Sequence, residues 1–321
     1  AVQGNGETSP LLNSTGVIIE AVVVADYQGE QKLGGFFMQE ETTDMDDNFL
    51  TSEGIFIADG SLTKDVTTGE TLRLKGDVTE TGGLTSLVNI SSWQPCGMET
   101  AVEPQAIALP LEENLSWEAL EGMLVTFSQK LTVIDNDLWG SEGIVDLASE
   151  RFYYPTMIAD PGAEAKAVAE NNQQLRIRLD DGSQVVNPLP YPPYLGPGNT
   201  LRLGDTADTI TGVVAEGGDG YHIQPTKLVS FNRDNPRPAL APPFSGRTRV
   251  AHFNVAGFFF FLIAAIGLSR ARKGSDLWRR FTSLLLLSGL AAEAVLLAFQ
   301  LIISQALCSY CLIILSLIAL A

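Results

Sequence analysis

The chain has 321 residues, a formal net charge of −18 and three cysteines. Its length is enough for two or three domains, and three cysteines are too few for a disulfide-stapled scaffold. Residues 1–250 hold 15 basic and 36 acidic residues, a net charge of −21, whereas residues 251–321 hold five basic and two acidic residues. This split indicates two physical environments. Because "AVQGNGETSP" has neither a basic start nor an apolar core, we expect residue 1 to be a mature or truncated end.

Residues 1–250 predict an all-β region, because short runs rich in Val, Ile, Thr and Phe alternate with Gly, Asp, Asn and Pro. One helical turn is expected at 116–122, where Ser116 can cap the first turn. Proline clusters at 187–198 and 235–246 indicate an ordered loop and a stiff linker. The expected strands are residues 16–28, 34–40, 54–59, 71–80, 84–91, 123–135, 174–181, 208–216 and 220–231.

Strands at this spacing are typical of small barrels or sandwiches. Two similar cycles are visible, and each contains a strand, a glycine-rich turn and another strand. We therefore expect two small β-barrels of the OB type, the first within residues 1–115 and the second within 116–234. A proline-rich linker with a final strand would follow at 235–252, and about three transmembrane helices would complete the chain.

An acidic loop, "ETTDMDDNFLTSEG" at residues 41–54, is a candidate metal site. Asp44, Asp46, Asp47 and Glu53 supply several carboxylates, which suits Ca²⁺ because this ion takes six to eight oxygen ligands. The loop lacks the glycine and the spacing of an EF-hand, and a charged surface turn is the alternative interpretation.

Three apolar runs, at residues 253–268, 281–304 and 308–321, predict membrane helices. A membrane helix needs about 20 apolar residues, which the second run supplies. All five basic residues of this part lie in the loop at 269–280, so the positive-inside rule predicts a cytoplasmic loop. The acidic β-region and the chain's last residues would then lie on the periplasmic or extracellular side. A buried helical hairpin in a soluble domain is the alternative.

The segment "ALCSYCLIIL" carries Cys308 and Cys311 in a C-x-x-C motif. At the start of a helix on an oxidising side, such a pair suits thiol–disulfide exchange. A static disulfide or plain helix packing remains open. Cys96 is the single cysteine of the β-region. It could exchange disulfides with Cys311, or it could be a structural or incidental residue. Glu293 is an acid within an apolar run, which is costly in lipid and suggests a basic partner on another subunit of a membrane assembly.

Several spaced motifs, among them "EAVVVADYQG" (20–29), "TSEGIFIADG" (51–60) and "NTLRLGDTADTITGVV" (199–214), resemble the N-terminal β-region of large secreted bacterial nucleases. The resemblance covers residues 2–254 and implies β-modules that precede a metal-dependent endonuclease/exonuclease/phosphatase domain. "RVAHFNV" (249–255) resembles the first strand of that domain, with Asn254 as its asparagine.

The catalytic residues that this family carries after that strand do not follow Val255. The chain's only histidines are His222 and His252, so the His–Asp base arrangement and metal cluster of the family cannot be assembled from it. We therefore expect no nuclease activity. A strand-binding groove for nucleic acid is disfavoured by the net charge of −21, although Arg176 and Arg178 offer a local basic stripe.

Residues 255–321, with "AFQLIISQALCSYC", resemble part of the membrane domain of the vitamin K epoxide reductase family. The resemblance implies that Cys308 and Cys311 are the redox pair next to a quinone, and that Gln300 lies near that quinone. This family normally has an earlier helix and a second cysteine pair in the outer loop, and this chain offers neither.

These observations lead to one main hypothesis and two alternatives. The main hypothesis is a membrane-anchored, extracytoplasmic β-barrel module of secreted-nuclease type that is non-catalytic and acts as a binding or accessory subunit of a membrane assembly. The first alternative is a quinone-linked thiol–disulfide oxidoreductase that uses the CSYC motif. The second is a fragment of, or a fusion derived from, an extracellular DNase.

Overall fold

In a computed structural model the chain divides into two compact units, residues 1–239 and residues 240–321. The division falls within the linker expected at 235–252. In the first unit the structure describes residues 2–46, 48–58, 60, 64–97, 101–189, 192–194 and 200–236; in the second it describes residues 263, 266, 270, 276–278 and 280–284.

The first β-region is a closed five-stranded barrel with the strand order β1-β2-β3-β5-β4. Its strands are β1 (Val17–Tyr27), β2 (Gly35–Gln39), β3 (Gly54–Ala58), β4 (Thr71–Thr81) and β5 (Leu84–Gly97). Neighbouring strands are antiparallel except for β3 and β5, which are parallel. The barrel closes because β1 pairs with β2 along one edge and with β4 along the other. The five expected strands and the closed barrel are confirmed.

The second β-region is a curled sheet of eight strands in the order β11-β8-β9-β10-β13-β12-β7-β6, where we expected a second small barrel of the OB type. Its strands are β6 (Gln105–Ile107), β7 (Leu124–Phe127), β8 (Leu131–Asp135), β9 (Val145–Ala148), β10 (Arg176–Leu179), β11 (Thr206–Ala207), β12 (Ile210–Gly217) and β13 (Gly220–Pro225).

The difference arises because the expected single strand at 123–135 is broken after Phe127. Its first half, β7, pairs with β12, and its second half, β8, pairs with β9. The remaining order repeats that of the barrel, since β10 and β13 are parallel as β3 and β5 are, and β12 and β13 form an antiparallel hairpin as β4 and β5 do. β6 lies within the expected first domain, yet it pairs with β7 of the second sheet.

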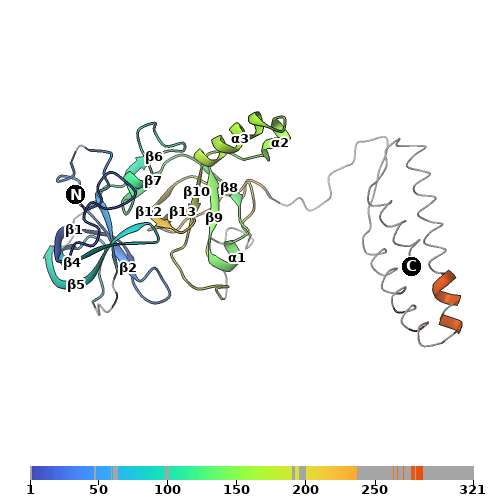
Figure 1. Cartoon of the computed structure of the whole chain (residues 1–321), viewed down its shortest axis with the longest axis horizontal. Coiled ribbons are helices and arrows are strands. Elements are labelled where there is room, and N and C mark those ends of the chain that lie inside the picture. Colours follow the sequence, from blue (N-terminus) through green and yellow to red (C-terminus); the bar gives the residue numbers. More distant parts are fainter. Residues whose placement is uncertain are drawn as a thin grey trace. The chain divides into compact units, whose positions relative to one another are not determined.

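The 3-10 helix η1 (Glu118–Leu120) confirms the expected helical turn, and the Ala119 N–H donates to Ser116 Oγ at 3.2 Å. The sequence did not predict α1 (Trp139–Glu142), α2 (Pro155–Ile158) or α3 (Ala163–Gln174). In α3 only Ala165 is buried, so this helix has almost no apolar stripe from which the sequence could predict it. Figure 1 shows α2 and α3 extending beyond the strands at one end of the unit.

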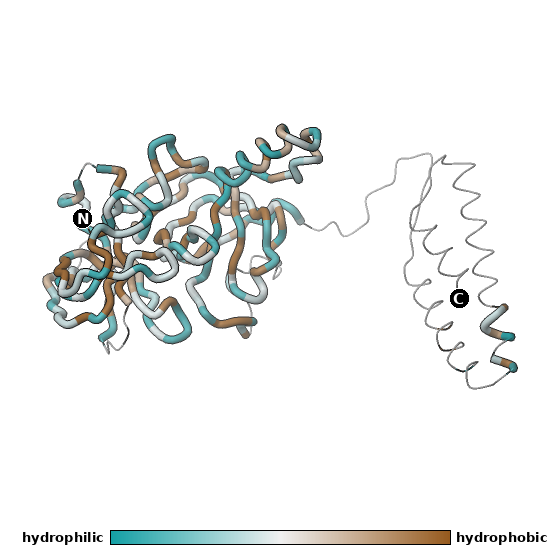
Figure 2. Tube along the Cα trace, viewed as in Figure 1, coloured by the Kyte–Doolittle hydropathy of each residue, from teal (hydrophilic) through white to brown (hydrophobic). Residues whose placement is uncertain are grey.

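The barrel and the curled sheet are packed against each other by a shared core. Apolar residues concentrate along the strands (Figure 2), and one buried cluster combines Tyr27 and Phe37 of the barrel with Val213 of the sheet. The Tyr27 hydroxyl donates to the Pro225 carbonyl at 2.8 Å. The backbones also meet closely, because a Cβ on Gly54 would lie 2.2 Å from the carbonyl carbon of Gly122.

In the second unit the expected helices at 253–268, 281–304 and 308–321 lie largely outside the described residues. Residues 276–278 and 280–284 are helical, and the Thr282 hydroxyl donates to the Trp278 carbonyl at 2.7 Å. Residues 276–278 belong to the loop expected at 269–280, so the helix starts earlier than we predicted. Taken over the residues that the structure describes, no helix combines the length and the apolar character needed to cross a bilayer.

Candidate functional site at the junction of barrel and sheet

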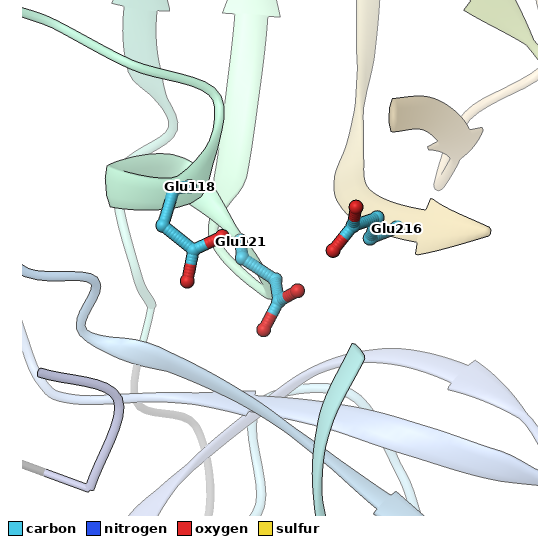
Figure 3. A group of neighbouring side chains, drawn as sticks. All are labelled: Glu118, Glu121 and Glu216. Carbon is cyan, nitrogen blue, oxygen red and sulfur yellow. The ribbon is translucent and has the colours of Figure 1, made fainter. Parts of the chain in front are cut away.

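Three glutamates gather where the barrel meets the curled sheet. Glu118 lies on η1, Glu121 follows that helix directly, and Glu216 lies near the end of β12. Each offers a carboxylate oxygen, and these oxygens all lie within 4.8 Å of one another. Figure 3 shows Glu216 directed toward Glu121 from the opposite side of the gap. We call Glu118, Glu121 and Glu216 the junction carboxylates.

Glu121 is completely buried, with 0% of its surface exposed. One carboxylate oxygen, Oε1, accepts the Thr85 N–H at 3.0 Å and the Gln3 side-chain amide at 3.1 Å, so the barrel provides both donors. Burial raises the pKa of Glu121 to about 8, and the negative charges of Glu118 and Glu80 act in the same direction against those two hydrogen bonds. A carboxyl with such a pKa is largely protonated at neutral pH when no cation is bound.

The other two junction carboxylates share this environment. The Tyr221 hydroxyl donates to Glu118 Oε2 at 2.7 Å, but burial outweighs that bond and raises the pKa of Glu118. Burial and the charge of Glu118 also raise the pKa of Glu216. Gly83, in the β4–β5 turn, lets Glu216 approach the barrel, because a Cβ at this position would lie 2.2 Å from Glu216 Oε2.

Glu80 of β4 completes the acidic surroundings from the barrel side. Its Oε1 accepts the Ser9 N–H at 2.9 Å and the Thr85 hydroxyl at 3.0 Å, whereas its Oε2 is buried without a hydrogen-bond partner. The site is therefore built by two regions, since the sheet supplies the junction carboxylates and the barrel supplies Gln3, Glu80 and Thr85 around them.

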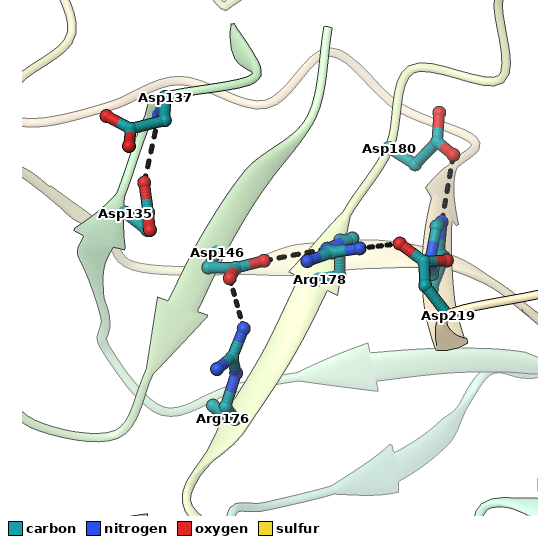
Figure 4. Close-up of polar contacts among 8 residues, drawn as sticks. Asp135, Asp137, Asp146, Arg176, Arg178, Asp180 and Asp219 are labelled. Atoms are coloured by element: carbon teal, nitrogen blue, oxygen red, sulfur yellow. Dashed lines mark hydrogen bonds and ion pairs between the residues drawn. The ribbon is translucent and has the colours of Figure 1, made fainter. Parts of the chain in front are cut away.

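A second charged cluster lies along β9, β10 and β13, and its acidic side chains contact arginine or histidine (Figure 4). Arg176 and Arg178 both bond Asp146, which is 6% exposed. Arg178 also pairs with Asp219. His222 lies between two acids, with Nδ1 at 2.9 Å from Asp180 and Nε2 at 2.9 Å from Asp219. We call these six residues the paired network.

The paired network changes the meaning of the basic stripe seen in the sequence. Arg176 and Arg178 are engaged by carboxylates of this chain, so they are not free to neutralise phosphates. The ion pairs instead hold β10 to β9 and to the β12–β13 hairpin, which is a structural role.

The acidic loop expected to bind Ca²⁺ does not bring its described carboxylates together as a group of three within reach of one ion. Asp46 Oδ1 accepts the Asn48 N–H at 2.7 Å, as in an ordinary Asx turn. Burial, a hydrogen bond with Glu40 and the charge of Asp46 raise the pKa of Glu53 to about 7. Asp44 lies in a turn with its N–H donated to the Glu41 carbonyl, and Asp47 lies outside the described residues.

The residues expected to carry redox chemistry are not tested by the structure. Cys308, Cys311 and Gln300 lie outside the described residues, as does Glu293. Cys96 is a free, exposed cysteine near the end of β5, and its thiol lies 3.5 Å from the Gln94 carbonyl.

A cleft of about 600 Å³ also opens between the barrel and the sheet. Its wall includes Val24, Tyr27, Thr68, Leu124, Thr211 and Thr226. We call it the junction cleft. Its volume falls in the range of small-ligand sites, and its lining combines apolar side chains with threonine hydroxyls, as such sites commonly do.

Sequence reasoning missed the junction carboxylates. The only local signal is the pair Glu118 and Glu121, whose spacing of three residues places both on one helical turn. Glu216 lies 95 residues later in the chain, so only the fold brings it to the site. No protein-family model matches the chain, and comparison with curated proteins finds no match either.

Proposed function

We propose that this chain is a membrane-tethered, extracytoplasmic binding module that does no catalysis of its own as present here and serves as an accessory subunit of a membrane assembly. The observation that carries the proposal is the division after Ala239, which separates a strand-rich unit from a unit that contains all three apolar runs. The basic residues between the first two runs favour a cytoplasmic loop and an outward-facing β-unit.

The strand order supports an OB-type module. In an OB barrel, the third and fifth strands pair in parallel and the first strand closes the barrel; the barrel here has this pairing, and the curled sheet repeats it with its first strand split. OB-type modules commonly present binding surfaces rather than catalytic groups. The junction cleft is the best candidate for a ligand site in the described part of the β-unit.

Nucleic acid is the less favoured ligand. The net charge of residues 1–250 is −21, and the two arginines that suggested a basic stripe are held in the paired network. Phosphate binding depends on basic side chains that can release counterions from the nucleic acid. A neutral or cationic segment of another membrane protein fits this surface better.

Cysteine labelling in whole cells tests the topology. In a chain with Cys308→Ser and Cys311→Ser, expressed behind a cleavable export signal, Cys96 is the only thiol and is exposed. We expect a membrane-impermeant maleimide to label it in intact cells. In the matched control, Cys96 is also replaced by Ser and Ser269→Cys places the only thiol in the basic loop, where labelling should require permeabilised cells.

Fractionation completes that test. The full chain should stay in the membrane pellet after alkaline carbonate washing, whereas a chain that ends at Ala239 should be released. A full-length chain that is monodisperse without detergent, or a Cys96 that reacts only after permeabilisation, would contradict the proposal.

A thiol–disulfide oxidoreductase is the second candidate, and the CSYC motif at the start of an apolar run is the observation that favours it. Transfer of two electrons and the two thiol protons from the Cys308–Cys311 dithiol to a quinone would leave a disulfide and a quinol. Thiol trapping of the full chain before and after quinone addition tests this candidate. If quinone oxidises the thiols and Cys308→Ser abolishes this oxidation, the oxidoreductase is favoured. If the thiol state does not change, the binding module is favoured.

A further inference from the structure

The junction collects negative charge without a balancing base. Thr85 bonds both Glu121 and Glu80, so Glu80 adjoins the junction carboxylates. Among the described residues none of these four acids forms an ion pair with a lysine, arginine or histidine. Like charges in a partly buried site repel, so they require protons or a cation for balance. In the paired network of the same unit, by contrast, each acid contacts an arginine or a histidine of this chain.

Three buried oxygens at the junction provide a second, independent sign of a ligand. Glu121 Oε2, Glu80 Oε2 and Gln3 Oε1 have no hydrogen-bond partner. Gln3 is not an acid, and it is 3% exposed. Its Nε2 donates to Glu121 Oε1 at 3.1 Å and to the Gly54 carbonyl at 2.9 Å, so the amide group of Gln3 adjoins Glu121. Leaving buried acceptors without a partner is costly, and carboxylate and amide oxygens are the donors that hard cations select.

We propose that Glu118, Glu121 and Glu216 bind a divalent cation, Ca²⁺ in preference to Mg²⁺, at the junction of barrel and sheet. Ca²⁺–oxygen distances of about 2.3–2.6 Å place opposite ligands about 4.6–5.2 Å apart, and the three oxygens lie within 4.8 Å of one another. Mg²⁺ binds at about 2.0–2.1 Å and demands a regular octahedron. Donors from a short helix, a loop and a strand fit the more adaptable Ca²⁺ shell.

The position of the site gives the cation a structural consequence. Its ligands belong to the curled sheet, while Gln3, Glu80 and Thr85 enclose it from the barrel. A bound cation would neutralise the charge that the barrel covers on packing, so binding would stabilise the contact between the two β-regions. Calcium binding would thereby fix the barrel against the curled sheet, whether or not a ligand occupies the junction cleft.

Terbium luminescence reports directly on this site. Trp117 stacks against Tyr221 with ring centroids 6.4 Å apart, and the Tyr221 hydroxyl bonds Glu118, so aromatic rings stand next to the proposed ion. With the full chain in detergent solution and excitation of tryptophan, we expect Tb³⁺ emission that Ca²⁺ displaces and Mg²⁺ displaces far less. Glu216→Gln should weaken Tb³⁺ and Ca²⁺ binding by roughly tenfold or more, because it removes one full ligand charge.

Two further variants make the result decisive. Glu121→Gln should weaken binding to a similar extent, and circular dichroism checks that it folds; if it does not, Glu216→Gln, on a partly exposed side chain, decides alone. Glu53→Gln with Asp46→Asn is the matched control in the other acidic loop and should leave Tb³⁺ and Ca²⁺ binding unchanged. The proposal is overturned if no emission is sensitised, if both junction variants bind as the wild type does, or if only the loop variant loses binding.

Discussion

Two groups of acidic side chains on the same β-unit differ in how their charge is balanced. In the paired network, Asp146, Asp180 and Asp219 each contact an arginine or a histidine. At the junction, Glu118, Glu121 and Glu216 have no ion pair with a base among the described residues, and their pKa values are raised. Burial alone therefore does not reveal the role of an acidic cluster. A balanced cluster stabilises the fold as it stands, whereas an unbalanced one depends on what binds to it.

The largest effect on stability is expected from a substitution in the paired network. Asp146→Ala leaves Arg176 and Arg178 without the buried acid that both contact, and it should lower the free energy of unfolding by about 3–5 kcal/mol. Chemical denaturation at pH 7 measures this loss. Asp137→Ala, nearby and exposed, is the control and should change stability by less than about 0.5 kcal/mol. Equal effects of the two substitutions would show that the paired network is not structural.

A substitution among the junction carboxylates should raise the free energy of unfolding, whereas Asp146→Ala lowers it. Without divalent cations, Glu121→Gln removes a buried charge and keeps an oxygen for the Thr85 N–H and the Gln3 amide. We expect it to raise the free energy of unfolding at pH 9 by roughly 1–3 kcal/mol. The same denaturation assay with a chelator measures the gain. A loss of stability comparable to that of Asp146→Ala would remove the distinction between the two clusters.

The pH dependence of stability sharpens the comparison further. The pKa of Glu121 is raised from 4.5 to about 8 on folding, so the stability linked to its proton is fully present below pH 4.5 and is lost as the pH rises toward 8. Raised pKa values of Glu118 and Glu216, which face it from η1 and β12, act in the same direction. The melting temperature of the wild type should therefore fall relative to that of Glu121→Gln between pH 5 and 8, and added Ca²⁺ should reduce this fall. Parallel curves would contradict the assignment.

The smallest effect is expected at Glu53. Burial and Glu40 raise its pKa to about 7, but it is only partly buried, so solvent screening limits what its charge costs. Glu53→Gln should change the free energy of unfolding at pH 8 by less than about 1 kcal/mol. A larger change, measured in the same assay, would place the charge-sensitive site of this unit in the acidic loop and not at the junction.

Much of the barrel was predictable because its strands carry strong local signals. β1, β2 and β3 are runs of Val, Ile and Phe bounded by glycine, and the structure places them within a residue or two of the expected ends. The strands that were missed are short or polar. β6, β9 and β11 have three, four and two residues, and the missed end of β5, "SWQPCG", is largely exposed and pairs with β4 beyond a shift in register.

The site was hidden for a different reason. Carboxylates were recognisable in the sequence where they are close together, as Asp44 and Asp46 are, yet the described residues of that loop do not form a group of three within reach of one ion. The junction carboxylates depend on β12 returning beside η1, and on a barrel that buries Glu121 with Gln3 from the first residues of the chain. Such convergence follows from tertiary packing, which no local pattern encodes.

Proton release on calcium binding would show whether the junction carboxylates are the calcium ligands. If Ca²⁺ binds the junction carboxylates, it must replace the proton that Glu121, with its pKa of about 8, holds at neutral pH. Calorimetric titration of the full chain in buffers of different ionisation enthalpy measures the number of protons released. We predict close to one proton per Ca²⁺ at pH 7, falling toward zero at about pH 10, and a clearly smaller release from Glu121→Gln. Calcium binding without proton release at pH 7, or an absence of calcium binding, would contradict the account.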